Sequence, residues 1–364
     1  MGRNNTKSND RSCEDEKILD RYTSKVNERL KDYLNGLTGE LKRYHPFMGL
    51  CADESREYIL RGGRRIMSCC ALLTYEGYTG EIDERILDLC VAIELYRHAI
   101  LIHDDIADED EMRRGGRSFH KLFVEGYDER FGNSLAIFYG NLLFAQSLES
   151  IKNSGIDEET KGQIIELFAE SYQSVNESQI LDILFEYTIP TVREWEIMAS
   201  NRASPLFGMI MAGGAMLGGA PEDEMKVLTR AGGHIGISFD IQDDIIGTFA
   251  TEEQYGRAVG SDIILCKKPL HIAYAYELAE RDDLEILERL MNKRSEEFYS
   301  DDERIKTVKE IVSRCGALDR AKETSRYHAK KAIELIRSTS IDDGVKDFFT
   351  GFIGFVAESL EWYG

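Results

Sequence analysis

Three carboxylates occur within five residues in the segment His103-Asp104-Asp105-Ile106-Ala107-Asp108. On a helix, Asp104 and Asp108 lie four residues apart and point in the same direction, while Asp105 lies about 100° around the axis. Carboxylates on one face repel each other, and hard divalent cations with oxygen ligands relieve that repulsion. Mg²⁺ in particular takes one or two carboxylates together with substrate phosphate oxygens. The spacing therefore favours a site for a metal-bound diphosphate.

Two arginines, Arg113 and Arg114, follow this acidic segment and precede Gly115. A guanidinium offers paired donors that match phosphate oxygens, so arginine suits the binding and charge balance of a diphosphate. The competing interpretation is an ordinary solvated surface, because most charged runs on helices face water. The first acidic segment alone leaves both interpretations open.

A second acidic cluster lies in Phe239-Asp240-Ile241-Gln242-Asp243-Asp244, inside an apolar segment over residues 231–249. Carboxylates in such a segment are costly to bury without a cation or a hydrogen-bond partner. The two clusters therefore predict two helices that face one another across a metal site.

The composition favours a large helical domain. The chain has 364 residues, of which 42% are hydrophobic, and it contains only five prolines. Apolar residues recur at helical spacing in the long spans between the prolines. We therefore predict an all-α fold, a large helical bundle in a single domain. Residues 1–15 are polar and of mixed charge, so we expect a disordered tail there and the all-α domain over residues 16–364.

Charge and cysteine usage exclude several classes of protein. The net charge of −21 argues against a nucleic-acid partner. Seven cysteines without a Cys-x-x-Cys pair favour reduced thiols in a cytoplasmic protein. Residues 203–220 carry no charge, but they are rich in glycine. We expect a buried, closely packed helix there and no integral membrane segment.

The order of several motifs resembles that of the trans-prenyl diphosphate synthases, the family of the farnesyl and geranylgeranyl diphosphate synthases. The motifs are, in chain order, Gly62-Gly63-Arg64-Arg65, His103-Asp104-Asp105-Ile106-Ala107-Asp108, Arg113-Arg114-Gly115, Gln179-x-x-Asp182, Asp243-Asp244 and Gly260-Ser261-Asp262 with Lys267. The resemblance runs from about residue 25 to the C-terminus. The joint occurrence of ordered motifs is more specific than any one motif.

The resemblance implies an all-α bundle around a deep central cavity, of the isoprenoid synthase type and usually a homodimer, although a heteromer stays open. It also implies three Mg²⁺ ions per active site. The implied reaction ionises an allylic diphosphate, lets isopentenyl diphosphate attack the carbocation, and ends with loss of a proton. Electrostatic stabilisation of the departing diphosphate is then the largest catalytic contribution, and metal ions act as Lewis acid and template.

The metal ligands implied by the resemblance are Asp104, Asp108, Asp243 and Asp244, with Asp105 as a supporting carboxylate of the first cluster. The first cluster is also expected to be catalytic, because its metal ions would draw charge onto the leaving group.

Basic residues take the remaining implied roles. Arg113 resembles the arginine that grips the allylic diphosphate, and Lys267 the lysine that covers it from the opposite wall. Both are expected to be catalytic as well as substrate-binding. Arg114 resembles a neighbour on the isopentenyl side, and Gln179 and Asp182 match a polar pair on an intervening helix.

The implied isopentenyl pocket departs from the family pattern. Met67 stands where the family usually has an arginine, which removes one charge-assisted contact. Arg97 stands where the family has a histidine, seven residues before the first Asp. With Arg64, Arg65 and Arg114 as further substrate-binding candidates, the pocket is expected to be remodelled but still cationic.

The implied allylic side departs from the pattern too. Arg202-Ala203 replaces a Lys-Thr pair, Asp240 replaces a glutamine, and Gly256-Arg257-Ala258 replaces Gly-Lys-Pro. We therefore expect Arg202, Asp240 and Arg257 among the substrate-binding residues. Gly247 stands where many relatives carry a third Asp. Asp240 either adds a carboxylate to that face or pairs with Arg202 or Arg257.

Product length is set in this family by residues just before the first acidic cluster. Ala99 is small and would open the floor beyond a C15 product, whereas Tyr96 would close it about one turn deeper, roughly 5.4 Å further. We expect a C20 product, geranylgeranyl diphosphate. Ile100 is a further candidate for narrowing the channel.

Two alternatives to a prenyltransferase remain. A terpene cyclase or lyase on the same fold would keep ionisation but lose condensation, as the altered pocket around Met67 would allow. A noncatalytic regulatory subunit of a prenyl synthase is the other, although such subunits usually lose the metal carboxylates that this chain keeps.

Overall fold

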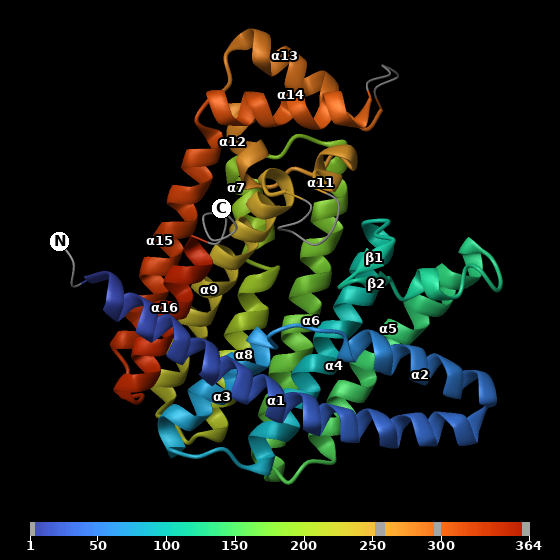
Figure 1. The fold of residues 1–364 in the computed structure, drawn as a ribbon, viewed down its shortest axis with the longest axis vertical. Coiled ribbons are helices and arrows are strands. Elements are labelled where there is room, and N and C mark those ends of the chain that lie inside the picture. Colours follow the sequence, from blue (N-terminus) through green and yellow to red (C-terminus); the bar gives the residue numbers. More distant parts are fainter. Residues whose placement is uncertain (1–3, 252–258, 295–299, 359–364) are drawn as a thin grey trace. The chain divides into compact units, whose positions relative to one another are not determined.

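The protein is built almost entirely from α-helices, as the sequence predicts (Figure 1). The computed structural model describes residues 4–251, 259–294 and 300–358, with side chains from Lys17 onward. Within these ranges the only strands are β1 (Met112–Arg113) and β2 (Gly116–Arg117), which form one antiparallel pair. The described chain divides into two compact units.

Unit 1 comprises Met1–Phe168 and Ile210–Met225. Besides the strand pair, its elements are α1 (Asn4–Tyr44), α2 (Pro46–Leu60), α3 (Ile66–Thr79), α4 (Glu84–Ala107), the 3₁₀ turn η1 (His120–Leu122), α5 (Glu129–Lys152) and parts of α6 (Glu158–Tyr187) and α8 (Ala203–Leu217). The sequence prediction of a tail over residues 1–15 and one domain over residues 16–364 stays a prediction.

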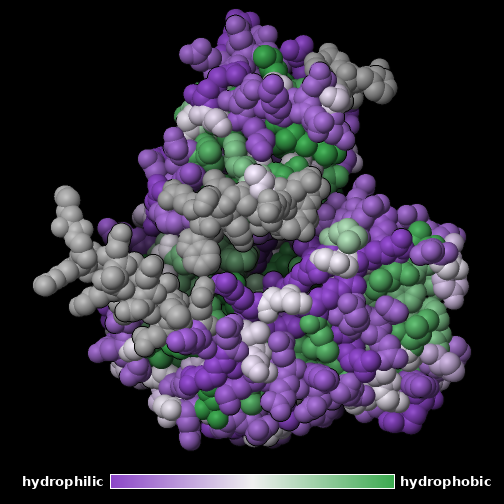
Figure 2. All heavy atoms as spheres, in the orientation of Figure 1, coloured by the Kyte–Doolittle hydropathy of each residue, from purple (hydrophilic) through white to green (hydrophobic). Residues whose placement is uncertain are grey.

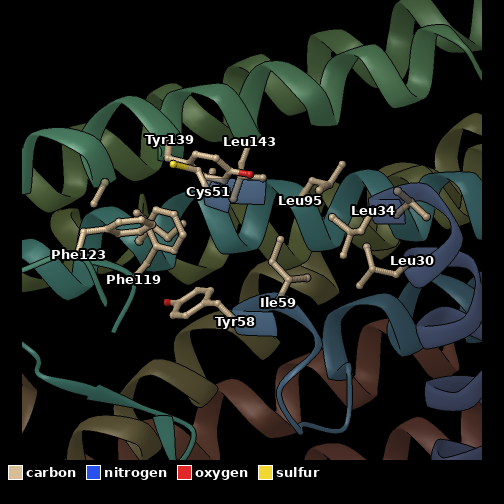
Figure 3. Close-up of a cluster of buried hydrophobic side chains, with 14 residues drawn as sticks. Leu30, Leu34, Cys51, Tyr58, Ile59, Leu95, Phe119, Phe123, Tyr139 and Leu143 are labelled. Carbon is tan, nitrogen blue, oxygen red and sulfur yellow. The ribbon is translucent and has the colours of Figure 1, made fainter. Parts of the chain in front are cut away.

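An aromatic and aliphatic core holds α1, α2, α4 and α5 together (Figure 3). Tyr58 of α2 packs against Phe119, whose ring centroid lies 4.9 Å from that of Tyr139 on α5. Burial of such side chains contributes about 1.5–3 kcal/mol each relative to exposure. The same core fixes the end of α4 that carries the first acidic cluster.

Helix α4 begins and ends at sites that its sequence specifies. The Asp83 carboxylate caps the N-terminus by accepting from the backbone N–H of Arg85 at 3.0 Å. The helix ends at Ala107, and the N–H of the next residue, Asp108, still donates to the Asp104 carbonyl at 2.8 Å. The acidic motif therefore occupies the last helical turn, and Asp104 and Asp108 keep helical spacing.

Unit 2 comprises Ala169–Met209 and Lys226–Gly364. Besides parts of α6 and α8, its elements are α7 (Val192–Ala199), most of α9 (Glu222–Phe249), α11 (Ser261–Ile264), α12 (Leu270–Leu278), α13 (Arg281–Leu290), α14 (Asp301–Arg314), α15 (Ala317–Arg337) and α16 (Asp343–Ala357).

Most of the uncharged segment over residues 203–220 forms α8, Ala203–Leu217, which is largely buried and closely packed, as predicted. In unit 2, a Cβ at Gly232 or Gly236 of α9 would collide with the backbone of Phe207 or Ala203 of α8. Glycine therefore allows these two helices to approach closely.

Figure 2 shows one face of the molecule, on which hydrophilic residues dominate and hydrophobic residues lie in separate patches. None of the helices in the described ranges is long and apolar enough to cross a membrane. The described cysteines are free, and most are buried.

Candidate active site

The three carboxylates of the first acidic cluster have different environments. Asp104 and Asp108 are partly exposed, whereas Asp105 is fully buried. The difference follows from the helix, which points the first two in one direction and turns Asp105 toward α2. Only Asp104 and Asp108 therefore present carboxylates outward.

Asp105 is held from both sides inside unit 1. The Tyr58 hydroxyl donates to its Oδ2 at 2.7 Å, and Arg113 Nε donates to its Oδ1 at 2.6 Å. Burial raises the pKa of Asp105 to about 6, against the opposite effect of Arg113 and the Tyr58 hydrogen bond. The geometry agrees with the predicted supporting role.

Arg113 is surrounded by carboxylates. Besides Asp105, its guanidinium contacts Asp110 at 2.8 Å and Asp104 at 3.9 Å. Burial disfavours its charge, but Asp105, Asp104 and Asp110 outweigh that effect and raise the pKa of Arg113. The side chain thus lies beside the first cluster, where an allylic diphosphate is expected.

The β1–β2 hairpin sends the two arginines to opposite sides. Its two-residue turn consists of Arg114 at φ 51° and Gly115 at φ 76°, and Arg113 pairs with Gly116 across it. Positive φ at both central residues is typical of a type I′ turn. Arg113 reaches back to the acidic cluster, while the Arg114 guanidinium lies against Gly63, where a Cβ would stand 3.3 Å from Cζ.

A second environment, basic in character, surrounds Arg114. Burial and the neighbouring charges of Arg97 and Arg65 lower the pKa of Arg114 to about 10. Burial also lowers the pKa of Arg97, against the opposite effect of Glu94. Arg114 Nη1 is buried and has no hydrogen-bond partner among the described residues. An anion would relieve both the repulsion and the unsatisfied donor.

Arg65, which the sequence places with the substrate-binding residues, is instead turned into the interior and is only 2% exposed. Its Nη1 donates to Glu94 at 2.8 Å, its Nη2 to the Ile59 carbonyl at 2.7 Å, and its Nε to Asn27 at 2.9 Å. These contacts use its donors inside the fold, so the geometry gives no support for contact with substrate. Arg64 has interactions of its own.

Sequence reasoning missed Glu94 and Tyr58. Glu94 is fully buried and accepts from Ser68 at 2.7 Å as well as from Arg65. Burial opposes its charge, but Arg65, His98 and Arg97 lower the pKa of Glu94 below its usual value. A lone glutamate in the apolar run of α4 is the signal that could have revealed it.

Unit 2 carries the second acidic cluster, and Arg202 lies among its carboxylates. Its guanidinium contacts Asp240 at 2.6 Å, Asp244 at 3.2 Å and Asp182 at 3.5 Å. Burial disfavours the charge of Arg202, but the three carboxylates outweigh that effect and raise its pKa. Of the alternatives that the sequence left open for Asp240, the structure supports pairing with Arg202.

Lys267 lies at the same cluster, with Nζ 3.4 Å from Asp182. Gln179 precedes Asp182 by one turn on α6. Asp243 is exposed, whereas Asp244 is partly buried. Arg257, another predicted substrate-binding residue, lies outside the described residues.

Comparison with known proteins identifies the family. The family model of polyprenyl synthetase matches residues 51–312. The chain belongs to the polyprenyl synthetase family.

The relatives of this polyprenyl synthetase share most of its length. A short chain isoprenyl diphosphate synthase of Methanothermobacter thermautotrophicus is 30% identical over 318 residues, which is 87% of this chain and 90% of the relative. A geranylgeranyl pyrophosphate synthase of Geoglobus acetivorans is 32% identical over 287 residues, 78% of this chain and 83% of the relative.

Solved structures agree with the family assignment. The geranylgeranyl pyrophosphate synthetase of Pyrococcus horikoshii superposes with a TM-score of 0.79 at 27% identity and covers 94% of this chain and 98% of its own. A geranylgeranyl pyrophosphate synthase of Corynebacterium glutamicum gives a TM-score of 0.86 at 22% identity, over 93% of this chain and 99% of its own, a likeness of fold.

The carboxylates proposed as metal ligands in this chain supply oxygen donors, the ligand type that Mg²⁺ prefers. Among the described residues, no group of three or more His, Cys, Asp or Glu side chains is placed to hold a metal ion. Mg²⁺ does not require such a group, since it binds through one or two carboxylates together with phosphate oxygens and water. Asp104 and Asp108 in unit 1, and Asp243 and Asp244 in unit 2, offer oxygen donors of that kind.

Of the predicted chain-length residues, Tyr96 and Ala99 are both completely buried. The Tyr96 ring makes edge contacts with Phe144 of α5 and Phe168 of α6, at centroid distances of 5.9 and 5.5 Å. Ala99 belongs to the core of Figure 3, while Ile100 is partly exposed. Aromatic rings from two other helices, α5 and α6, therefore pack against Tyr96.

Proposed function

We propose that this chain is a Mg²⁺-dependent prenyltransferase that condenses an allylic diphosphate with isopentenyl diphosphate and makes geranylgeranyl diphosphate. The observation that carries the proposal is the β1–β2 hairpin. It directs Arg113 to the acidic cluster and Arg114 to the basic group with Arg97. Condensation needs two diphosphates bound side by side, and these two arginines offer two anion-binding environments. The relatives named as geranylgeranyl diphosphate synthases support the same activity.

Metal ions held by Asp104 and Asp108, and by Asp243 and Asp244, would act as Lewis acids on the allylic diphosphate. Arg113 adds a fixed positive charge beside the first pair, and Lys267 does so in unit 2. As the allylic C–O bond breaks, negative charge accumulates on the departing diphosphate, and cations already in place stabilise it without reorganisation. We propose three Mg²⁺ ions for the complete site.

Isopentenyl diphosphate is assigned to the basic group. Arg114 and Arg97, with Arg64, bind its diphosphate and direct its double bond toward the carbocation. A C–C bond then forms between the allylic carbocation and the terminal alkene carbon of isopentenyl diphosphate. A carbon next to the resulting cationic centre loses its proton to the departed diphosphate, which restores a double bond. Holding two reactants in a fixed orientation converts an encounter into an effectively unimolecular step, which is worth roughly 7–11 kcal/mol at best.

Product length follows from Tyr96. Its ring, enclosed by Phe144 and Phe168, is proposed as the floor that stops the growing tail. The small side chain of Ala99 is proposed to leave room for the tail on the turn above. A C20 product is the expected result.

A terpene cyclase is the second candidate, and Met67 is the observation that favours it. This side chain is a neutral thioether and is buried, so no charge stands at the position where the family has an arginine. A cyclase would need only the allylic side of the site. Arg97 supplies a cation to the basic group that would bind isopentenyl diphosphate, and for this reason we prefer condensation over cyclisation.

We also propose a cytoplasmic homodimer, with a heteromer as the alternative. The last turns of α6 expose an apolar stripe formed by Ile180, Ile183, Leu184 and Tyr187. On α5, Phe138 is 73% exposed. Exposed apolar stripes of this kind are typical of protein–protein interfaces. The molar mass in solution tests the proposal, and a monomeric mass would refute it.

Product analysis tests the function. Purified protein is mixed with Mg²⁺, isopentenyl diphosphate and, in separate reactions, C5, C10, C15 and C20 allylic diphosphates, and products are identified by mass spectrometry. Elongated diphosphates ending at C20 are expected. Loss of diphosphate without elongation would identify a cyclase, and silence in every reaction would favour the regulatory subunit.

A further inference from the structure

The turn that carries Lys267 is held in an unusual conformation. It follows the short helix α11, and Cys266 has a φ of 62°, in the left-handed region that costs a non-glycine residue about 1–2 kcal/mol. Surrounding contacts must therefore hold this turn in place. The contacts come from Lys268 and Arg304.

Lys268 lies inside the protein, only 2% exposed. Its Nζ donates to the backbone carbonyls of Phe185 at 3.0 Å, Glu186 at 3.4 Å and Cys266. An ammonium group has three N–H donors, so each carbonyl can receive one. No carboxylate is needed to hold this charge, because three carbonyl dipoles converge on it.

Two of these carbonyls belong to the end of α6, which finishes at Tyr187. Carbonyls in the last turn of a helix lack partners within the helix, and the negative end of the helix dipole attracts a cation. Lys268 supplies both the missing donors and the cation. It thereby connects the Lys267 turn to the C-terminus of α6.

The connection bears directly on Lys267. Asp182, its ion-pair partner at 3.4 Å, lies on α6 one turn before Glu186. Lys268 thus joins the turn that carries one partner to the helix that carries the other. A shift of the turn along α6 would alter the separation of Lys267 and Asp182.

Arg304 of α14 holds the other side of the turn. It donates to the Ile264 carbonyl at 3.1 Å, the Leu290 carbonyl at 2.6 Å and Cys266 Sγ at 2.6 Å. Opposite Arg304, Lys268 supplies hydrogen bonds from the turn to α6, in addition to the Lys267–Asp182 ion pair.

We propose that Lys268 is a positioning residue that sets where Lys267 meets the allylic diphosphate. This inference rests on the proposed function only for the identity of that ligand. Lys268 itself does not touch substrate, and it acts through the backbone of its neighbour.

The charge of Lys268 gives the proposal a distinctive pH signature. Burial lowers the pKa of Lys268 to about 8, with Cys266 and Glu186 acting in the opposite direction. The other charged groups that face it are Arg304 and Lys293. A neutral amine has only two N–H donors for three carbonyls, so the turn should loosen above about pH 8.

The decisive variants are K268M, K268R and a matched control, K293M. Lys293 reaches the same end of α6 and its charge faces Lys268, but its described hydrogen bond goes to the Glu186 side chain and not to the backbone of the turn. Turnover and the KM of each substrate are measured from pH 6.5 to 9.5, together with thermal unfolding. Binding of inorganic diphosphate with Mg²⁺ is measured calorimetrically as a readout independent of turnover.

For K268M we expect a roughly 10- to 100-fold loss in kcat/KM for the allylic substrate, an unchanged KM for isopentenyl diphosphate and weaker diphosphate binding. K293M should stay within about twofold of the parent. We expect K268R to fold. Because arginine stays charged throughout this pH range, the activity of K268R should not decline above about pH 8.

A decline that persists in K268R, or a loss in K293M equal to that in K268M, would overturn the proposal. Should K268M fail to fold, the K268R profile and its diphosphate affinity still decide the question. If the parent enzyme formed no product with any allylic substrate, the proposed function would be refuted instead. The difference in diphosphate affinity between the parent and K268M would then test the positioning role on its own.

Discussion

The Tyr58 hydroxyl donates a 2.7 Å hydrogen bond to Oδ2 of Asp105, the carboxylate whose other oxygen receives Arg113. This contact gives the middle aspartate of the first cluster a different environment from the aspartates before and after it. Both oxygens of Asp105 are occupied by protein donors, whereas Asp104 and Asp108 are partly exposed. Neighbouring carboxylates of one motif therefore have different roles, and their substitutions should have different consequences.

Replacing Asp104 should abolish ionisation and leave the fold intact. The substitution Asp104→Ala removes a proposed metal ligand and relieves repulsion within an acidic turn. Turnover with an allylic diphosphate and Mg²⁺, together with thermal unfolding, provides the measurement. A folded variant with near-parent turnover would disprove the metal assignment.

Replacing Asp105 should instead destabilise unit 1. Asp105→Ala leaves the partly buried Arg113 guanidinium and the buried Tyr58 hydroxyl without this acceptor. Because Arg113 keeps its contacts with Asp110 and Asp104, we expect a cost of about 1–3 kcal/mol. Urea unfolding measures the loss, with Asp104→Ala as the control. A cost below about 1 kcal/mol would show that Asp105 is not a structural anchor.

Replacing Arg65 should lower stability, whereas replacing Arg114 should weaken substrate binding. Arg65→Met leaves Glu94 buried with one fewer cation, so we expect a loss of about 3–5 kcal/mol in the free energy of unfolding. Arg114→Gln should spare stability, because it relieves repulsion, and should raise the KM of isopentenyl diphosphate by roughly 10- to 100-fold. Equal effects of both variants on KM would contradict this division.

The sequence predicted the helical fold and the outward pair Asp104 and Asp108, because periodicity and spacing depend on local geometry. It could not predict the direction of Arg65. Arg65 and Arg64 are neighbours in one motif, but a left-handed residue at the start of α3, with Arg65 at φ 48°, turns the side chain inward. A motif gives residue types, whereas side-chain direction depends on backbone angles that only the folded chain reveals.

Acid should weaken unit 2 through His328. Its Nδ1 lies 2.9 Å from Nδ1 of His234, and burial, with the neighbouring His234, lowers the pKa of His328 to about 4. An unfolded chain takes up this proton near pH 6.5. The unfolded state therefore binds more protons between about pH 6.5 and 4, and stability falls as the pH falls through that window.

The substitution His328→Asn isolates this contribution, since the amide can keep the contact without titrating. Urea unfolding of both proteins at pH 7 and pH 4.5 gives the comparison. We expect the variant to lose less stability than the parent on acidification. Parallel losses would show that His328 does not contribute.

Product length should respond to Tyr96 and Ala99 in opposite directions. Tyr96→Ala removes the proposed floor and should lengthen the product beyond C20, while Ala99→Phe should shorten it. Mass spectrometry of the products provides the measurement, and thermal unfolding reports the cost of the changed core volume, about 1–5 kcal/mol. Unchanged distributions in both variants would remove these residues from the channel.

The hairpin was the part of the site least accessible from sequence. Two-residue turns are usually recognised by Asn-Gly or Asp-Gly, and Arg114-Gly115 gives only half of that signal. Asp240 illustrates the same limit, because the sequence left two roles open for it. The contact with Arg202 joins the turn before α8 to α9. The two residues are 38 positions apart in the sequence and meet only in the folded chain.

Arg202 gives the second acidic cluster a cation of its own. As a proposed substrate-binding residue, Arg202 would be drawn from Asp240 and Asp244 by a diphosphate, and a magnesium ion on the proposed ligand Asp244 would release it in turn. Each ligand thus removes a competitor of the other, and by reciprocity each must strengthen the other's binding. On this proposal, one ion-pair group would make metal and substrate bind together, so a divalent cation alone should bind to unit 2 only weakly.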